Sequence, residues 1–173
     1  MRSTVTKDYE GRRLIVERRY TASVDLVWAC FTQARHLRKW WGPTGWLVDV
    51  FELDVRPGGV WRYRLRPEAE HELDEEQWAR AVYRVVEPPH RPQFDDAFAD
   101  ASGAVIEGTE MPTTVLIDRD AGTTSVSITV AFTGVQQLDE AEAMGMVEGF
   151  TDALERLDAT LAGDLDDLDG AAS

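Results

Sequence analysis

This sequence has little cysteine and no long apolar run. Its 173 residues include one cysteine, Cys30, so no internal disulfide can form, and no Cys/His spacing suggests zinc. No apolar run approaches the roughly 20 residues that a membrane-spanning helix needs. The N-terminal stretch MRSTVTKDYEGRRL has no apolar segment that could act as a secretory signal. We therefore expect a cytoplasmic protein that has no membrane partner and holds no metal or other cofactor.

Basic residues are scarce beside acidic ones. The chain carries 18 Lys and Arg against 32 Asp and Glu, a formal net charge of −14. Residues 1–66 hold thirteen basic and seven acidic residues, whereas the remainder holds five and twenty-five. Nucleic-acid binding usually needs a net basic face, so we expect no nucleic-acid partner. A solvated acidic surface explains the charge.

The length and the 43% hydrophobic content fit one domain with one core. We expect a flexible N-terminal arm over 1–11, a single domain over 12–163 and an acidic, disordered tail over 164–173. Neither internal repeats nor an interdomain linker are evident in the sequence.

Alternating hydrophobic residues predict several β-strands. Residues 12–20 are rich in β-formers, and 78–89 predict a strand that ends at two prolines. Residues 92–100 predict a weaker strand, and 113–134 predict a hairpin with its turn near Gly122. The acidic stretch 67–77, which contains His71, is expected to form an exposed loop.

A further hairpin is predicted around Pro57-Gly58-Gly59. The side chains that alternate with arginines after this turn are expected to face the interior: Trp61, Tyr63 and Leu65. A four-residue loop would put Phe51 and Leu53 on the arginine face, whereas a three-residue loop puts them with the aromatic side chains. A slip of one residue flips a whole face, so we expect the three-residue loop, with Gly58 left-handed.

Helical signals lie on both sides of these strands. Ser23 is expected to cap a short helix, and a second short helix is expected over 34–40, before Gly42-Pro43. From Asp139 the apolar residues recur at steps of three and four, which predicts one amphipathic helix of about 25 residues that ends at Gly163. Strands grouped beside segregated helices indicate an α+β domain with an antiparallel sheet. A curved sheet around the long helix would leave a cavity between them.

Three of the six tryptophans lie between Trp40 and Trp46. Trp40 follows Leu37 by three positions, so we expect it to pack inward as a structural plug. Trp41 points about 100° away around the helix. Trp41 and Trp46 are therefore expected at the rim of the cavity.

Four stretches of the chain, in order, carry a family resemblance: FTQARHLRKWWGPTGW, DVRPGGVWRYRL, VYRVVEPPHR and GMVEGFTDALERLDATL. With them the chain resembles the bacterial proteins related to the C-terminal domain of the Hsp90 ATPase activator, in the START/Bet v 1-like helix-grip superfamily. The chain has Phe150 where the family usually has Trp, and the acidic 67–77 segment where it often has a Gly-containing turn. The resemblance implies about seven strands wrapped around a long C-terminal helix, two short helices after the first strand, and a hydrophobic pocket.

We expect this pocket to bind a small hydrophobic or aromatic molecule. Core packing remains an alternative role for its aromatic side chains. The expected ligand-binding residues are Trp41, Trp46, Phe51, Leu53, Trp61, Tyr63, Tyr83, Phe132, Met146 and Phe150.

Two other functions remain open. An enzyme of the polyketide cyclase/dehydratase or hydrolase type would need an acid or base inside the pocket, and the predicted interior has Tyr63 and Tyr83 but no His, Asp or Glu. The three histidines form no known catalytic motif. A chaperone-regulating interaction is less expected, because the chain lacks room for the activator's separate N-terminal domain. The resemblance also allows a homodimer.

Overall fold

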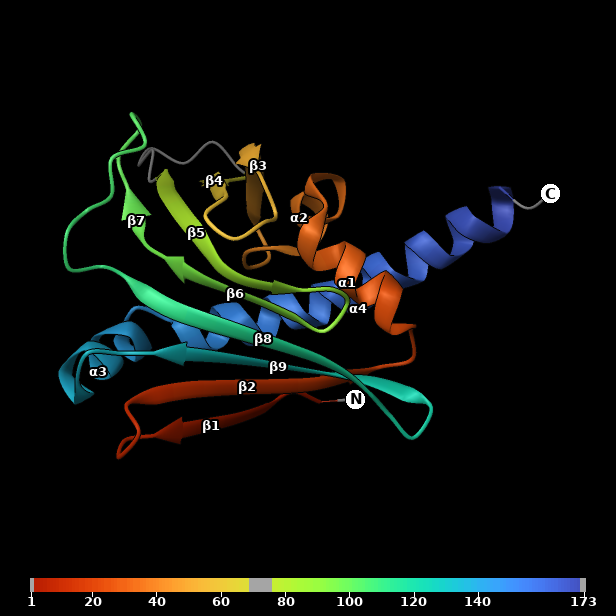
Figure 1. Cartoon of the computed structure of the whole chain (residues 1–173), viewed down its shortest axis with the longest axis horizontal. Helices are drawn as coiled ribbons and strands as arrows, with labels where there is room; N and C mark the ends of the chain where they lie inside the picture. The colour runs from red at the N-terminus through yellow and green to blue at the C-terminus, as the bar shows by residue number, and fades with distance from the viewer. Residues whose placement is uncertain (1, 69–75, 172–173) are drawn as a thin grey trace.

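The computed structural model describes residues 2–68 and 76–171, with side chains described up to residue 163 (Figure 1). The predicted acidic loop, with His71, falls mostly outside the described residues. The strands are β1 (Thr4–Asp8), β2 (Arg13–Tyr20), β3 (Trp46–Leu53), β4 (Val60–Pro67), β5 (Gln77–Glu87), β6 (Arg91–Asp96), β7 (Phe98–Ala99), β8 (Met111–Asp120) and β9 (Thr123–Ala131). The helices are α1 (Val24–Thr32), α2 (Ala34–Trp40), α3 (Val135–Ala143) and α4 (Met146–Ala171).

All strand pairs are antiparallel and belong to one sheet in the order β1-β2-β9-β8-β6-β5-β4-β3, with β7 paired to β5. The sheet curves around α4, which crosses its concave side (Figure 1). The α+β helix-grip prediction is therefore confirmed. The described residues contain nine strands rather than about seven. None of the described helices has the length and apolar content needed to cross a membrane.

The N-terminal segment supplies one of the additional strands. β1 pairs with β2 along its whole length, with Val5 opposite Val16, and Val5 packs against the core. A strand of the sheet therefore lies within the segment 1–11, for which we expected a flexible arm. The alternation in TVTKD is too short to predict a strand without its partner, because its pairing with β2 and the packing of Val5 against the core appear only in the folded chain.

The C-terminal region forms two helices rather than one. α3 ends at Ala143, and Gly145 takes φ +89°, a left-handed conformation that glycine adopts readily. The apolar stripe continues from Val147 along α4, so its predicted face was correct although its predicted start was not. α4 also runs on to Ala171 instead of ending at Gly163, so its backbone is helical where we expected a disordered tail.

The β3–β4 hairpin has the predicted register next to its turn. Leu53 lies opposite Trp61, Glu52 lies opposite Arg62, and Gly58 has φ +83°. A bulge between Val50 and Glu52 then shifts the pairing and turns Phe51 to the outer face. The interior position expected for Phe51 was therefore wrong.

Phe51 is 46% exposed and stacks on Trp78 of β5, with 5.1 Å between ring centroids. The guanidinium groups of Arg62 and Arg64 each lie 5.3 Å from the centre of the Phe51 ring. These cation–π contacts favour the outer position of the ring.

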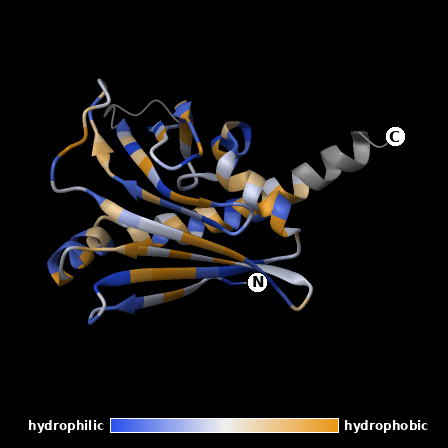
Figure 2. Ribbon diagram, in the orientation of Figure 1, coloured by the Kyte–Doolittle hydropathy of each residue, from blue (hydrophilic) through white to orange (hydrophobic). Residues whose placement is uncertain are grey.

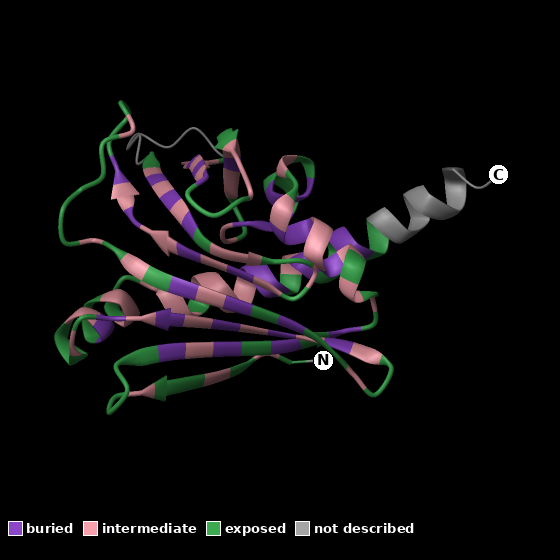
Figure 3. Ribbon diagram, viewed as in Figure 1, coloured by how far each residue is buried: buried purple, intermediate pink, exposed green. Residues whose placement is uncertain are grey.

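The core fills the concave side of the sheet. Buried residues alternate with intermediate or exposed ones along β2, β5, β8 and β9 (Figure 3), and hydrophobic residues alternate with polar ones in the same strands (Figure 2). Trp40 is fully buried, and its Nε1 donates to the carbonyl of Cys30 at 2.8 Å. The predicted packing of Trp40 as a plug is confirmed. The N-cap at Ser23 is confirmed as well, because its Oγ accepts from the amide of Leu26 at 3.1 Å.

Candidate functional site

A cavity of about 470 Å³ lies between the sheet and the two C-terminal helices. Its volume is within the range of small-molecule sites, which is roughly 300–1,000 Å³. Most of its lining side chains are apolar or aromatic. They are Trp41, Pro43, Trp46, Leu65, Phe98, Met111, Ala141, Met144, Met146, Phe150 and Ala153, with the glycines 42, 108, 145 and 149 and the polar residues Tyr63, Gln77, Asp96, Thr109, Gln137 and Glu140.

The segment after α2 forms one wall of the cavity. Trp41 caps the end of α2, and Gly42 turns the chain with φ +94°. Arg156 of α4 donates to the carbonyls of Gly42 and Pro43, at 2.9 and 3.0 Å. Arg156 thus ties this wall to α4, while the amide of Trp46, at the start of β3, donates to the carbonyl of Pro43 at 3.2 Å and ties the wall to the sheet.

Aromatic rings line the floor of the cavity around Trp41. The Trp41 ring makes edge contacts with Tyr63 at 6.1 Å and with Phe150 at 6.3 Å between centroids. Behind it, Trp61 contacts Trp41 at 4.9 Å and stacks on Tyr63 at 4.5 Å. Edge-on and offset packing of this kind favours a rigid aromatic surface.

Asp96 places a carboxylate in this apolar cavity. It ends β6, where it follows the buried Phe94 by two positions and therefore shares the inward face of the strand. Its Oδ2 accepts a hydrogen bond from the hydroxyl of Tyr63 at 2.9 Å, and its Oδ1 accepts one from the amide of Ala97 at 3.1 Å. Among the residues that the structure describes, none of the ion pairs involves Asp96.

Burial changes the acidity of this group of residues. Desolvation raises the pKa of Asp96 to about 6, although the bonds from Tyr63 and Ala97 act in the opposite direction. Burial, together with the negative charge of Asp96, raises the pKa of the Tyr63 hydroxyl well above 10. The same causes raise the pKa of the neighbouring Tyr83. The site therefore combines a carboxyl group that titrates near neutrality with a phenol that stays protonated.

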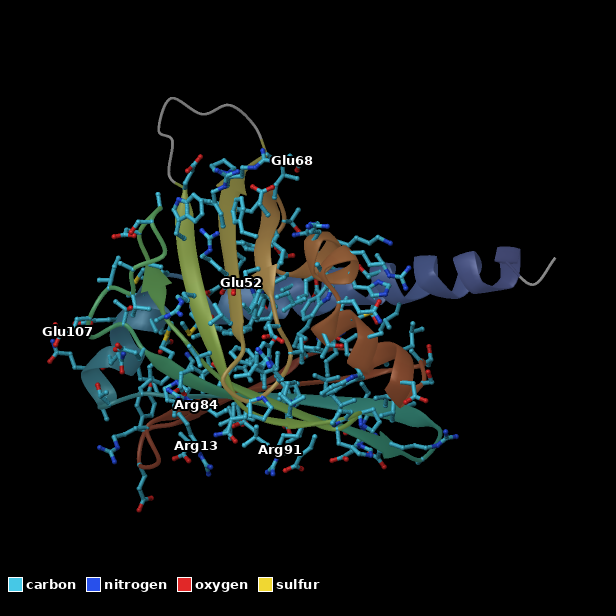
Figure 4. The ribbon with its side chains drawn as sticks, turned by 45° about the horizontal axis from the view of Figure 1, so that its top comes forward. Arg13, Glu52, Glu68, Arg84, Arg91 and Glu107 are labelled. Carbon is cyan, nitrogen blue, oxygen red and sulfur yellow. The ribbon has the colours of Figure 1, made fainter. Side chains whose placement is uncertain are left out.

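Exposed lining residues mark the mouth of the cavity. Gly108 comes from the connection between β7 and β8, whereas Glu140 and Met144 come from α3 and its C-cap. Figure 4 labels Glu107, the residue before Gly108, at the outer edge of the molecule near α3. Met144 is 72% exposed, so an apolar side chain stands at the entrance.

The structure brings half of the expected ligand-binding residues to the cavity. Those that line it are Trp41, Trp46, Tyr63, Met146 and Phe150. The expected residues outside the cavity lining are Phe51, Leu53, Trp61, Tyr83 and Phe132. Of these, Trp61, Tyr83 and Phe132 are core residues and Leu53 packs against the core. The alternative of core packing therefore describes Trp61, Tyr83 and Phe132.

Sequence reasoning missed Asp96 and Glu140. For Asp96 a signal was present, because the period of two that makes Phe94 an inward residue also turns Asp96 inward. For Glu140 the sequence offered none, since its position at the cavity depends on the break between α3 and α4.

A family model described as "Activator of Hsp90 ATPase homolog 1-like protein" matches residues 21–162. No curated protein matches the sequence at a significant level.

Several solved structures share the fold. Protein Ms6760 from Mycobacterium smegmatis is 25% identical, with a TM-score of 0.83 over 92% of this chain and 96% of that one. A protein from Arthrobacter aurescens is 28% identical, with a TM-score of 0.84 over 92% of this chain and 91% of that one. The AHSA1 protein from Silicibacter pomeroyi is 21% identical, with a TM-score of 0.70 over 88% of this chain and 99% of that one.

Proposed function

Because the chain belongs to the family of Activator of Hsp90 ATPase homolog 1-like proteins and its helix-grip fold contains a cavity of about 470 Å³, we propose that it binds a small hydrophobic or aromatic molecule there. The cavity itself, with its aromatic floor, is the observation that carries the proposal. At about 25 cal/mol per Å², burying about 300 Å² of apolar ligand surface contributes about 7.5 kcal/mol. On its own this gain would correspond to a dissociation constant of about 3 μM, and part of it is lost to the entropy cost of binding, so we expect dissociation constants of about 10 μM to 1 mM.

A glycine on α4 offers a direct test of where the ligand binds. Gly149 lines the cavity, and a Cβ built there meets nothing within 4 Å. The side chain of Gly149→Leu would therefore start from open space and occupy volume that a ligand needs. Gly163→Leu is the matched control, because a Cβ at this exposed α4 position also meets nothing within 4 Å and lies outside the cavity. Both changes replace a helical glycine and are expected to favour the helix.

The probe is N-phenyl-naphthylamine, a neutral dye whose fluorescence rises in apolar surroundings. We expect saturable binding at one site, a loss of affinity of about tenfold or more in Gly149→Leu, and unchanged affinity in Gly163→Leu. If the wild type does not bind the dye, or if both variants bind it equally well, this cavity is not the binding site.

Asp96 favours a second candidate, an enzyme that uses the same cavity. General acids and bases work best when their pKa lies near the working pH. The pKa of Asp96 is raised to about 6, and its carboxyl group lines the cavity beside a phenol that stays protonated. Asp96 as base, oriented by the hydrogen bond that it accepts from Tyr63, would suit a cyclase, dehydratase or hydrolase acting on an aromatic substrate.

Catalysis is tested with aryl acetates for hydrolysis and an aryl β-hydroxy ketone for dehydration. An enzyme of this kind is expected to turn one of them over with a rate that rises as the pH passes through about 6. Asp96→Asn should abolish the rate and leave dye binding intact. If neither reaction is accelerated, or if Asp96→Asn reacts as fast as the wild type, Asp96 is not a general base for these reactions.

A further inference from the structure

The charges around the cavity have one sign. The described lining residues include two carboxylates, Asp96 and Glu140, and no Lys, Arg or His. Asp96 is half-buried at the end of β6, and its described hydrogen bonds come from a neutral hydroxyl and a backbone amide. A carboxylate held in an apolar site without a cation is costly, because burial removes its water without supplying an opposite charge.

The geometry points to a ligand that supplies this missing charge. We infer that the molecule bound in the cavity is a hydrophobic cation, an aryl or alkyl amine whose ammonium group contacts Asp96 and whose apolar part fills the space between the sheet and α4. This inference rests on the proposed binding function and specifies its ligand class. A neutral hydrophobic ligand would leave the carboxylate of Asp96 uncompensated, and an anionic ligand would be repelled by both carboxylates.

The aromatic side chains around Asp96 suit the same ligand. Tyr63 reaches Asp96 through its hydroxyl, and the ring of Trp41 lies 6.1 Å from the Tyr63 ring. A cation close to the carboxylate would thus lie near these two rings, and it gains from a ring only where the face of that ring turns towards it. Trp and Tyr faces attract cations within about 6 Å, and the attraction is stronger where water is excluded.

The surface charge favours entry of such a ligand. Glu140 lies exposed at the mouth, and the whole chain carries a net charge of −14. A negative potential at the opening of a cleft raises the local concentration of cations and speeds their association. The apolar Met144, also at the mouth, is adaptable enough to contact an aromatic ring that passes it.

Three naphthalene probes of the same ring isomer separate charge from shape: naphthylmethylamine, a cation at neutral pH, naphthylmethanol, which is neutral, and naphthoate, an anion. Affinities are measured by calorimetry at pH 7.5. We expect the amine to bind about tenfold or more tightly than the alcohol, since a charged hydrogen bond to a carboxylate exceeds a neutral one. Naphthoate is expected to bind most weakly.

Two variants of adjacent residues locate the effect. Asp96→Asn should reduce the preference for the amine over the alcohol to about one and keep the alcohol's affinity. Asp95→Asn is the matched control, because Asp95 faces outward and pairs with Arg84, with 2.7 Å between Oδ2 and Nε. We expect the preference in Asp95→Asn to equal that of the wild type.

A pH series supplies a readout that needs no variant. The groups that face Asp96 or share its cavity are Tyr63, Tyr83 and Glu140. Because the pKa of Asp96 is raised to about 6, the preference for the amine should fall between pH 7.5 and pH 5. This trend should be absent in Asp96→Asn.

The outcomes distinguish the ligand class from the binding function. Equal binding of amine and alcohol by the wild type, or an unchanged preference in Asp96→Asn, would overturn the cation and leave the binding cavity in place. Binding of none of the three probes, together with failure of the neutral dye, would overturn both.

Discussion

Replacing Asp96 with asparagine should make the protein more stable at neutral pH. In the native state the pKa of Asp96 is about 6, raised from its ordinary value of 3.8 mainly by desolvation. The native state therefore holds the Asp96 proton more tightly than the unfolded chain does. This tighter binding of the proton adds its full contribution to the free energy of unfolding below pH 3.8, and the contribution is lost as the pH rises towards 6. Above pH 6 the ionised carboxylate carries a constant cost.

The magnitude follows from the difference between the two pKa values. A shift of one in pKa corresponds to about 1.4 kcal/mol, so the full difference amounts to about 3 kcal/mol. Asp96 is only half-buried and lines a cavity, so solvent reduces this cost to about 1–3 kcal/mol. Asparagine keeps the size of the side chain and its bond to Tyr63 but carries no charge. The bond from Tyr63 to the ionised carboxylate is already part of the native pKa of Asp96, so the diagnostic quantity is how the stability difference changes with pH.

The assay is urea unfolding of both proteins at several pH values from 4 to 8. We expect the gain in Asp96→Asn to grow by about 1–3 kcal/mol, mostly between pH 4 and 6, and then to stay level. Tyr63 and Tyr83 stay neutral throughout, because burial raises the pKa of both above 10. A difference that does not change with pH, or one that shrinks as the pH rises, would refute the assignment of Asp96 as a desolvated carboxylate.

Asp49 provides a control of opposite sign. Hydrogen bonds from Arg66 and Arg64 lower the pKa of Asp49. Its stabilising contribution is present above pH 3.8 and is lost as the pH falls through its lowered native pKa. Asp49→Asn should therefore be less stable than the wild type at neutral pH, and this loss of stability should shrink towards acid pH. The gain in stability of Asp96→Asn should also shrink towards acid pH, so the two variants differ from the wild type in opposite directions.

Two further predictions concern the scaffold. Trp40→Ala should lower the free energy of unfolding by about 3–5 kcal/mol, because it leaves a large cavity and removes the bond to the Cys30 carbonyl; an unchanged melting temperature would contradict its role as a plug. Gly58→Ala should cost only about 1 kcal/mol, since its φ is +83° but a Cβ there meets nothing within 4 Å. Gly59→Ala should cost clearly more, because its Cβ would lie 1.9 Å from the carbonyl oxygen of Asp54; denaturant titrations that rank the two variants in the reverse order would contradict this.

Most of the architecture could be predicted from periodicity, because burial on one face imposes a period of two on strands and of 3.6 on helices. The same rule set the register beside the β3–β4 turn, where Leu53 lies opposite Trp61. The rule failed at Phe51, because a bulge adds one residue to one strand there. With or without the bulge, each face of the strand carries a mixture of side chains that suits it, so the pattern alone does not reveal the bulge. The sequence contained a hint of this in Trp78, which reaches Phe51 from β5, but only the pairing of three strands brings the two rings together.

The cavity was harder to predict than the sheet, because it depends on missing side chains and on a helix break between the sheet and the C-terminal helices. Gly145 breaks the expected single helix and lets α3 place Glu140 at the mouth, while Gly149 leaves room where any larger side chain would project inward. Neither glycine alters the apolar period, so a pattern of hydrophobic residues predicts the same fold with or without an open site. Asp96 differs, since a carboxylate on the inward face of a strand is expensive wherever the core is closed. Its presence two positions after Phe94 was therefore a local sign in the sequence that the interior at this end of the sheet is not fully packed.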